Sequence, residues 1–237
     1  MRQRLAEFRG AEQLSDAAAE LLATPTLDAV VVHEVDAVLD LHWQSGSADA
    51  SEVLASNIAL LYDAVPAFKE VDETCEAWWN DNPIASYSFT PQLGYVFRKD
   101  KGTGSGTFGD ENRLHVDSIH HGVLTASIRV DTNAANREFF AYRPNIGPTL
   151  DQQGYNSPNY DAVQQQLHKM TRRPFWYGKY ALTRIVQMPG DCIMFSNHPY
   201  PAIHGAVQQR EANPRKAAQA IVAGYSLKAN ETSLIGL

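Results

Sequence analysis

The chain has 237 residues, enough for one large domain or two small ones and for a substantial buried core. Hydrophobic residues make up 44% of it and charged residues 20%, as in ordinary globular proteins. The formal net charge is −7. This charge argues against nucleic acid or an anionic membrane as the main partner, because both bind basic surfaces.

The cysteines and the N-terminal residues indicate a cellular compartment. Cys75 and Cys192 are the only two cysteines, and they form no CxxC pair. Residues 1–13 are charged and lack the apolar segment of a signal peptide, and no run of eighteen apolar residues follows. We therefore expect a reduced, cytoplasmic protein without a membrane-spanning helix.

The first third of the chain has mainly helical patterns. Apolar residues recur there at helical spacing, and one β-branched run interrupts them. The expected elements are a strand at 27–33 and helices at 2–23, 35–43, 52–65 and 67–80.

After Pro83 the chain consists mostly of short extended segments separated by Gly, Pro and Asn turns. The expected strands lie at 86–89, 93–98, 123–130, 137–143, 180–188, 191–195, 203–207 and 217–227. Between them we expect a loop with four glycines at 100–112, an irregular segment at 144–160 and a helix at 161–172. Helices followed by many short strands predict a mainly β fold, a barrel or jelly roll with a helical layer outside. Residues 1–83 would form that layer and residues 84–237 the β core, in a single domain overall.

A candidate metal site begins with His115 and Asp117 in the stretch LHVDSIHHG. Residues two apart on a strand share a face, so an imidazole and a carboxylate would stand side by side. The third ligand must come from elsewhere. His204 is preferred to His198, because HGAV suits a strand whereas His198 precedes a proline-rich turn. Two histidines and one carboxylate suit Fe(II) with open positions, although zinc hydrolysis is compatible with the same ligands.

An arginine eleven residues after His204 favours an anionic cosubstrate. If segments 203–207 and 217–227 pair as a hairpin, Arg215 comes back beside His204. A guanidinium there could bind the distal carboxylate of 2-oxoglutarate with two hydrogen bonds. Arg210 is the alternative, but it falls in the turn QREANP.

The segment at 123–130 alternates in polarity. Its polar positions are Thr125, Ser127 and Arg129, and the positions between them are apolar. Alternation on a strand puts the three polar side chains on one face. That face either lines a pocket or meets solvent, and the sequence leaves both open.

These motifs resemble the Fe(II)/2-oxoglutarate-dependent dioxygenase superfamily, in its phytanoyl-hydroxylase-like and prolyl-hydroxylase-like branches. The resemblance covers residues 84–228 and is carried by LHVD at 114–117, MPGDCIMF at 188–195, HG at 204–205 and RKA at 215–217. It implies a double-stranded β-helix with His115, Asp117 and His204 as iron ligands. It also implies that Arg215 anchors 2-oxoglutarate, with Arg129 or its face-mates Ser127 and Thr125 as helpers.

The carboxylate bears on the type of reaction. Radical halogenases of this superfamily have Ala or Gly where this chain has Asp117, so the aspartate argues for hydroxylation. The hypothesis is an enzyme that uses Fe(II), 2-oxoglutarate and dioxygen to hydroxylate an unactivated C–H bond of a small molecule, such as a free amino acid or a natural-product intermediate. Two alternatives stay open: a cupin-like metal hydrolase or oxygenase that does not use 2-oxoglutarate, and a non-catalytic jelly-roll module that binds a small ligand.

Overall fold

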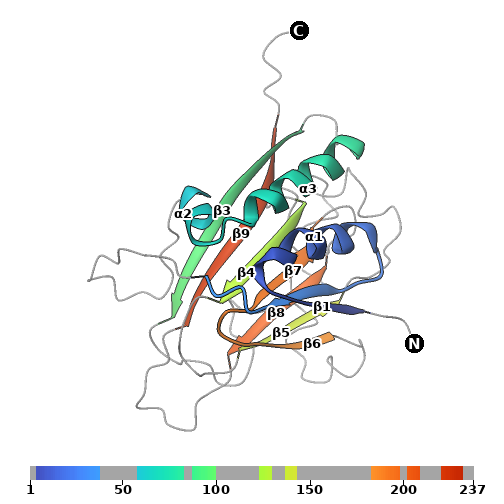
Figure 1. Ribbon diagram of the computed structural model, residues 1–237. Helices are drawn as coiled ribbons and strands as arrows, with labels where there is room; N and C mark the ends of the chain where they lie inside the picture. The colour runs from blue at the N-terminus through green and yellow to red at the C-terminus, as the bar shows by residue number, and fades with distance from the viewer. Residues whose placement is uncertain are drawn as a thin grey trace, which may run out of the picture.

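The computed structural model describes residues 4–37, 58–82, 87–99, 123–129, 137–142, 183–197, 202–208 and 220–231. These residues form two β-sheets and a small group of helices (Figure 1). The predicted loops at 100–112 and 144–160 and the predicted helix at 161–172 lie outside the described residues. Within the described part of the chain, no helix has the length and apolar character needed to cross a membrane.

The larger sheet has six strands in the order β1-β2-β7-β4-β9-β3. Their bounds are Leu5–Arg9 for β1, Ala29–His33 for β2, Cys192–Ser196 for β7, Leu124–Arg129 for β4, Ala220–Glu231 for β9 and Tyr87–Lys99 for β3. β1 and β2 are parallel and the other neighbours are antiparallel, so the sheet is mixed. The pairing of β2 with β7 joins the N-terminal part of the chain directly to the β core.

The smaller sheet has three antiparallel strands in the order β6-β5-β8. They are β6 at Thr183–Gln187, β5 at Arg137–Tyr142 and β8 at Ile203–Gln208. From β6 to β9, successive strands of the chain alternate between the two sheets.

The predicted hairpin between segments 203–207 and 217–227 is therefore wrong. β8 pairs with β5, whereas β9 pairs with β3 and β4 in the other sheet. Since β9 is bonded along both of its edges, it has no edge left for β8. Because β8 and β9 do not pair, a hairpin between them gives no reason to expect Arg215 beside His204.

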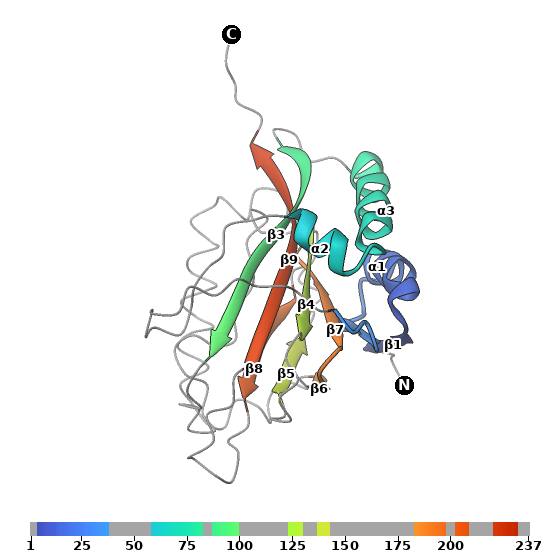
Figure 2. The same ribbon diagram turned by 60° about the vertical axis from the view of Figure 1, so that its left-hand side comes forward.

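Two helices cover one face of the larger sheet. The helical elements are the 3₁₀ turn η1 at Ala11–Gln13, α1 at Leu14–Ala23, α2 at Ile58–Ala64 and α3 at Phe68–Asp81. α1 and α3 lie on the same side of the sheet (Figure 2). Leu14 and Leu21 of α1 and Phe68 and Val71 of α3 are fully buried in one core with this face of the sheet.

A second core lies on the opposite face, between the two sheets. It joins Val31 of β2, Ile193 and Phe195 of β7, Phe139 of β5 and Ile185 of β6. In β7 the intervening residues, Cys192 and Met194, belong to the core beneath the helices instead. This strand is buried on both faces, which explains why its sequence CIMF is apolar without alternation.

The N-terminal segment departs from its predicted helix. Residues 5–9 form β1, and the α-helix begins only at Leu14. Leu5 and Phe8 are three residues apart, so they match a helical pattern, but pairing with β2 keeps the segment extended. Gly10, at φ +91°, ends the strand. The described residues among the first 83 thus contain two strands where one was predicted.

Two further predictions need correction. Residues 35–37 are not helical, because Glu34 and Asp36 have positive φ angles of 59° and 49°. The strands predicted at 86–89 and 93–98 form the single strand β3, with a register shift between Leu93 and Tyr95. Pro91 is tolerated inside it because β3 stands at the end of the sheet order, where proline costs no ladder bond.

Candidate functional site between the two sheets

His204 enters the space between the sheets. It lies on β8 opposite Ala141 of β5, a residue of the core between the sheets, and it is only 4% exposed. Its ring is stacked with Phe139, with centroids 5.8 Å apart and planes 9° apart. The ring of Phe195 from β7 lies 3.8 Å from it, centroid to centroid. Residues from both sheets therefore hold the imidazole in place.

A backbone carbonyl determines which nitrogen of His204 carries the proton. Nδ1 lies 3.0 Å from the carbonyl oxygen of Ala202. Because a carbonyl only accepts, Nδ1 is the donor and the lone pair of the neutral ring is on Nε2. Metal-binding histidines commonly donate their second ring N–H to a carbonyl in this way. The tautomer of His204 therefore fits the role of a metal ligand that binds through Nε2.

The polar face of β4 points inward and not to solvent. Thr125, Ser127 and Arg129 are all buried. Leu124, Ala126 and Ile128 belong to the core beneath the helices, as the predicted alternation requires. Thr125 is the cross-strand partner of Phe195, so this end of β4 lies next to the ring that contacts His204.

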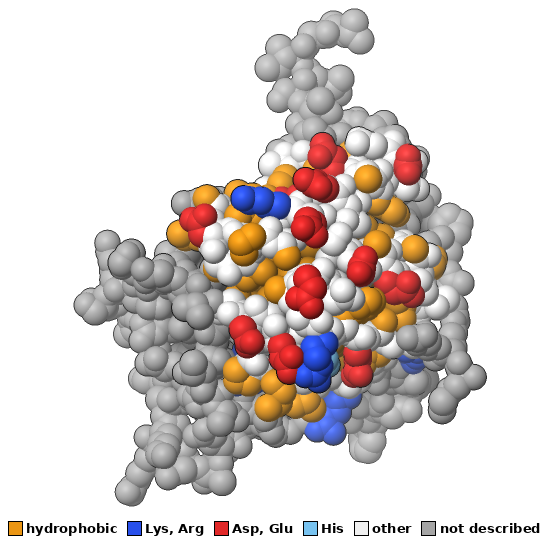
Figure 3. All heavy atoms as spheres, in the orientation of Figure 1, with side chains coloured by type: hydrophobic (Ala, Val, Ile, Leu, Met, Phe, Trp, Pro, Cys, Tyr) orange, Lys and Arg blue, Asp and Glu red, His pale blue; other side chains and the backbone are white. Residues whose placement is uncertain are grey.

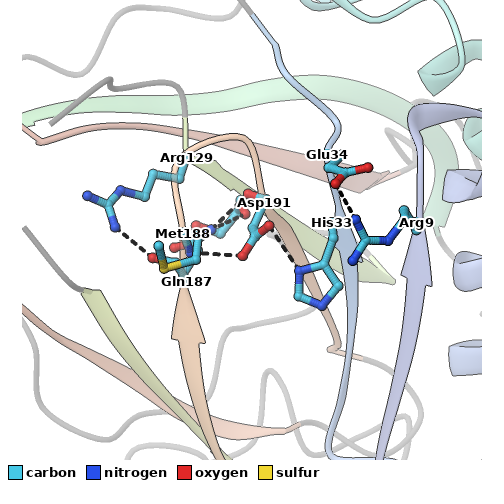
Figure 4. A network of polar contacts seen from close by, with 8 residues as sticks. Arg9, His33, Glu34, Arg129, Gln187, Met188 and Asp191 are labelled. Atoms are coloured by element: carbon cyan, nitrogen blue, oxygen red, sulfur yellow. Dashed lines mark hydrogen bonds and ion pairs between the residues drawn. The ribbon is translucent and has the colours of Figure 1, made fainter. Parts of the chain in front are cut away.

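Arg129 is held at the other end of β4 by backbone groups. Its side chain is 1% exposed, and Nη1 donates to the carbonyl oxygen of Gln187 at 2.6 Å. The Gln187 side chain in turn donates to the carbonyl oxygens of Ser127 at 2.8 Å and Asp191 at 3.2 Å (Figure 4). Four residues of strand separate Arg129 from Thr125, roughly 13 Å. The guanidinium and His204 therefore belong to opposite ends of the inner face.

The motif MPGD forms a turn that fixes the end of β4. The Asp191 carboxylate accepts from the backbone N–H of Met188 at 2.8 Å and lies 3.0 Å from Nδ1 of His33 (Figure 4). The N–H of Gly190 donates to the carbonyl oxygen of Arg129 at 2.9 Å. No role was predicted for His33, because no sequence motif indicates this long-range contact. In the structure His33 braces the turn, and Figure 4 shows the Arg9–Glu34 ion pair beside it.

Several predicted site residues lie outside the described residues. These are His115, Asp117 and Arg215, together with the competitor His198. Among the residues that the structure describes, no three His, Cys, Asp or Glu side chains are grouped closely enough to hold a metal ion. In the described part of the chain, Thr125 is paired with Phe195, whose ring contacts His204, whereas Ser127 and Arg129 lie further along β4.

One buried polar residue of this region was missed in the sequence. Asn197 directly follows β7 and donates from Nδ2 to Oγ1 of Thr125 at 2.8 Å. Its only sequence signal is its place, directly after a strand of mostly apolar residues.

No protein-family model matches this chain, and no curated protein matches it either. Solved structures of KdoO, a non-heme Fe(II) alphaketoglutarate-dependent dioxygenase, and of SnoN, a non-heme alphaketoglutarate-dependent epimerase, are similar to this chain. The apo Kdo hydroxylase KdoO is 14% identical, with a TM-score of 0.46 over 95% of this chain and 90% of that one. Its complex with alphaketoglutarate and Fe(III) is 12% identical, with a TM-score of 0.44 over 95% and 90%. The epimerase SnoN from nogalamycin biosynthesis is 15% identical, with a TM-score of 0.43 over 93% and 88%.

Proposed function

We propose that the protein is an Fe(II)- and 2-oxoglutarate-dependent dioxygenase that hydroxylates an unactivated C–H bond of a small molecule, such as a free amino acid or a natural-product intermediate. The observation that carries the proposal is the state of His204. Its ring is buried between the two sheets, and the Ala202 carbonyl holds the proton on Nδ1, so Nε2 is the nitrogen that carries the lone pair.

The strand order supports a double-stranded β-helix as the fold. Such a fold needs consecutive strands that alternate between two facing sheets, and β6 to β9 do so. Within the described residues, β8 is the end strand of the smaller sheet. We propose that His115 and Asp117 converge with His204 on one metal ion. Residues 1–83 would be a layer packed on the core at 84–237 within one domain, in line with the β2–β7 pairing.

The proposed roles of the side chains follow from their chemistry. His115, Asp117 and His204 would bind the iron, and Arg215 would bind the distal carboxylate of 2-oxoglutarate. Arg129, Ser127 and Thr125 would assist from the inner face of β4. When bound, the iron with 2-oxoglutarate and dioxygen supplies the oxidising power for the C–H bond.

The chain itself contributes position and exclusion of water. Phe139 and Phe195 pack against the His204 ring, so the imidazole keeps one orientation and is screened from solvent. The Ala202 carbonyl keeps the ring in the tautomer that can act as a ligand.

The test is succinate formation by the purified protein with Fe(II), ascorbate and 2-oxoglutarate. We expect His204→Ala and Asp117→Ala to lose both iron binding and succinate release. His33→Asn is the matched histidine control, because an asparagine can still donate to Asp191 and should keep the activity. Parent-like succinate release from both Ala variants would rule the assignment out. Metal-dependent activity without 2-oxoglutarate would select the cupin-like alternative instead.

A further inference from the structure

Asn197 has a side-chain amide that is satisfied at one end only. The residue is fully buried, and its Nδ2 donates to Oγ1 of Thr125. Among the described residues, its Oδ1 is buried without any hydrogen-bond partner. A buried acceptor without a donor is costly and rare in folded proteins, so it calls for a ligand that pairs with it.

The amide lies on the inner side of the larger sheet. Ile193 and Phe195, the alternate residues of β7, belong to the core between the sheets. The bond to Thr125, the cross-strand partner of Phe195, keeps the Asn197 side chain on this same side. The other two buried atoms without partners in the described part, Asp72 Oδ1 and Tyr225 Oη, belong to α3 and to the core beneath the helices.

Residues next to Asn197 in the chain are connected to His204 by a backbone hydrogen bond and a ring contact. The N–H of Ala202 donates to the carbonyl oxygen of Ser196 at 2.8 Å, which joins the end of β7 to the start of β8. Ala202 is the residue whose carbonyl holds the His204 ring. Phe195, two residues before Asn197, lies against that ring. The unpaired oxygen therefore lies on the same inner side of the sheet as Phe195, whose ring contacts the proposed metal ligand His204.

The chemistry of the amide oxygen restricts what can occupy this place. An amide oxygen accepts hydrogen bonds and cannot donate them. The dianion of 2-oxoglutarate offers only acceptors, so the cosubstrate cannot pair with it. We propose that Asn197 Oδ1 binds a hydroxyl or amino group of the organic substrate, and that Thr125 holds the amide in position. This inference rests on the proposed function, since it assigns the substrate of that same site.

The test compares small molecules that share a carbon skeleton and differ in one donor group. Free L-amino acids would be added to the anaerobic Fe(II)- and 2-oxoglutarate-loaded protein, each beside its 2-hydroxy and its unsubstituted acid; norvaline, 2-hydroxypentanoate and pentanoate form one such set. The readout is the melting temperature over a concentration series. We expect amino or hydroxy members to raise it and the unsubstituted acids to leave it unchanged.

Two variants of Asn197 separate the acceptor from the shape of the residue. Asn197→Leu removes the acceptor and should weaken the apparent affinity about tenfold, the usual effect of one hydrogen bond. Asn197→Asp keeps an acceptor oxygen and should retain binding, so it also serves if the leucine variant does not fold. Asn82→Asp, at the C-terminal end of α3, is the control for the added charge and should behave as the parent.

Three results would contradict the inference. They are an equal shift by all three members of a set, an undiminished shift in Asn197→Leu, and the absence of any shift in the parent. Succinate formation by the parent without added substrate is measured separately. If succinate forms but no shift depends on Asn197, only this inference fails; if no succinate forms, the proposed function fails.

Discussion

Asp72 on α3 is a carboxyl in an unfavourable environment. One of its oxygens is buried without a hydrogen-bond partner among the described residues. Burial, with smaller contributions from the neighbouring Glu76 and Glu73, raises the pKa of Asp72 to about 7. The folded protein thus holds a proton on this group that the unfolded chain gives up near pH 4. Stability contributed by Asp72 falls as the pH rises from about 4 to about 7, and the loss is complete above that.

This shift predicts a stabilising substitution. Asp72→Asn removes the ionisable group and should raise the free energy of unfolding by about 1 kcal/mol at pH 8, a value discounted for the partial exposure of the side chain. At pH 5 the gain should be much smaller. Urea denaturation at the two pH values measures it. Asp16→Asn is the control: its exposed carboxyl lies in the first turn of α1, where a negative charge is favourable, so no gain is expected.

The two cysteines give a second prediction at the scale of single residues. Cys75 and Cys192 are both fully buried in the core beneath the helices. Burial raises the pKa of both thiols; Asp72 adds to the effect at Cys75 and Asp191 at Cys192. Because the thiolate is the reactive form, neither cysteine should react with a disulfide reagent at pH 8 until the protein unfolds. Rapid labelling of the native protein would contradict this packing.

At the scale of elements, the turn between β6 and β7 depends on Gly190. Its φ of +83° is strained for any residue with a Cβ, and an added Cβ would meet the Asp36 carboxylate. Gly190→Ala should therefore cost roughly 2 kcal/mol of stability. Adding Asp36→Ala should recover the part due to the clash and leave the part due to φ. Chemical denaturation of the single and double variants measures both parts, and a neutral single variant would be inconsistent with this turn.

The strands show how far local sequence patterns reach. Alternation placed Thr125, Ser127 and Arg129 on one face correctly, because the period of a strand is a local property. The spacing of Leu5 and Phe8 led to the wrong prediction of a helix for this segment. The segment is a strand because it pairs with β2, which lies further along the chain. Pairing partners depend on the whole fold, which is why β9 was wrongly joined to β8.

The same limit applies to the candidate site. The sequence context of His204 predicted a strand, and the structure has this residue buried on β8. The half-satisfied amide of Asn197 could not be foreseen, since it depends on a contact with Thr125, 72 residues away. The roles of His204, His115, Asp117 and Arg215 in the site are still predictions.

At the scale of the whole molecule, the larger sheet divides the protein into two environments. Its outer face carries the helices, and the surface of this helical side bears many acidic side chains and few basic ones (Figure 3). Exposed Glu70, Glu73 and Glu76 of α3 are among them. Its inner face meets the smaller sheet around His204. The charged surface and the proposed chemistry are thus on opposite sides of one sheet.

The position of β7 also has a consequence for synthesis on the ribosome. β2 pairs with β7, and the contact between His33 and Asp191 beside this pair spans 158 residues. The valine-rich β2 is therefore translated long before its central partner emerges. Until β7 is synthesised, the edge of β2 that pairs with it is exposed in the nascent chain and is prone to aggregation. Chaperones that bind nascent chains, or slow elongation, would have their largest effect on folding in this interval.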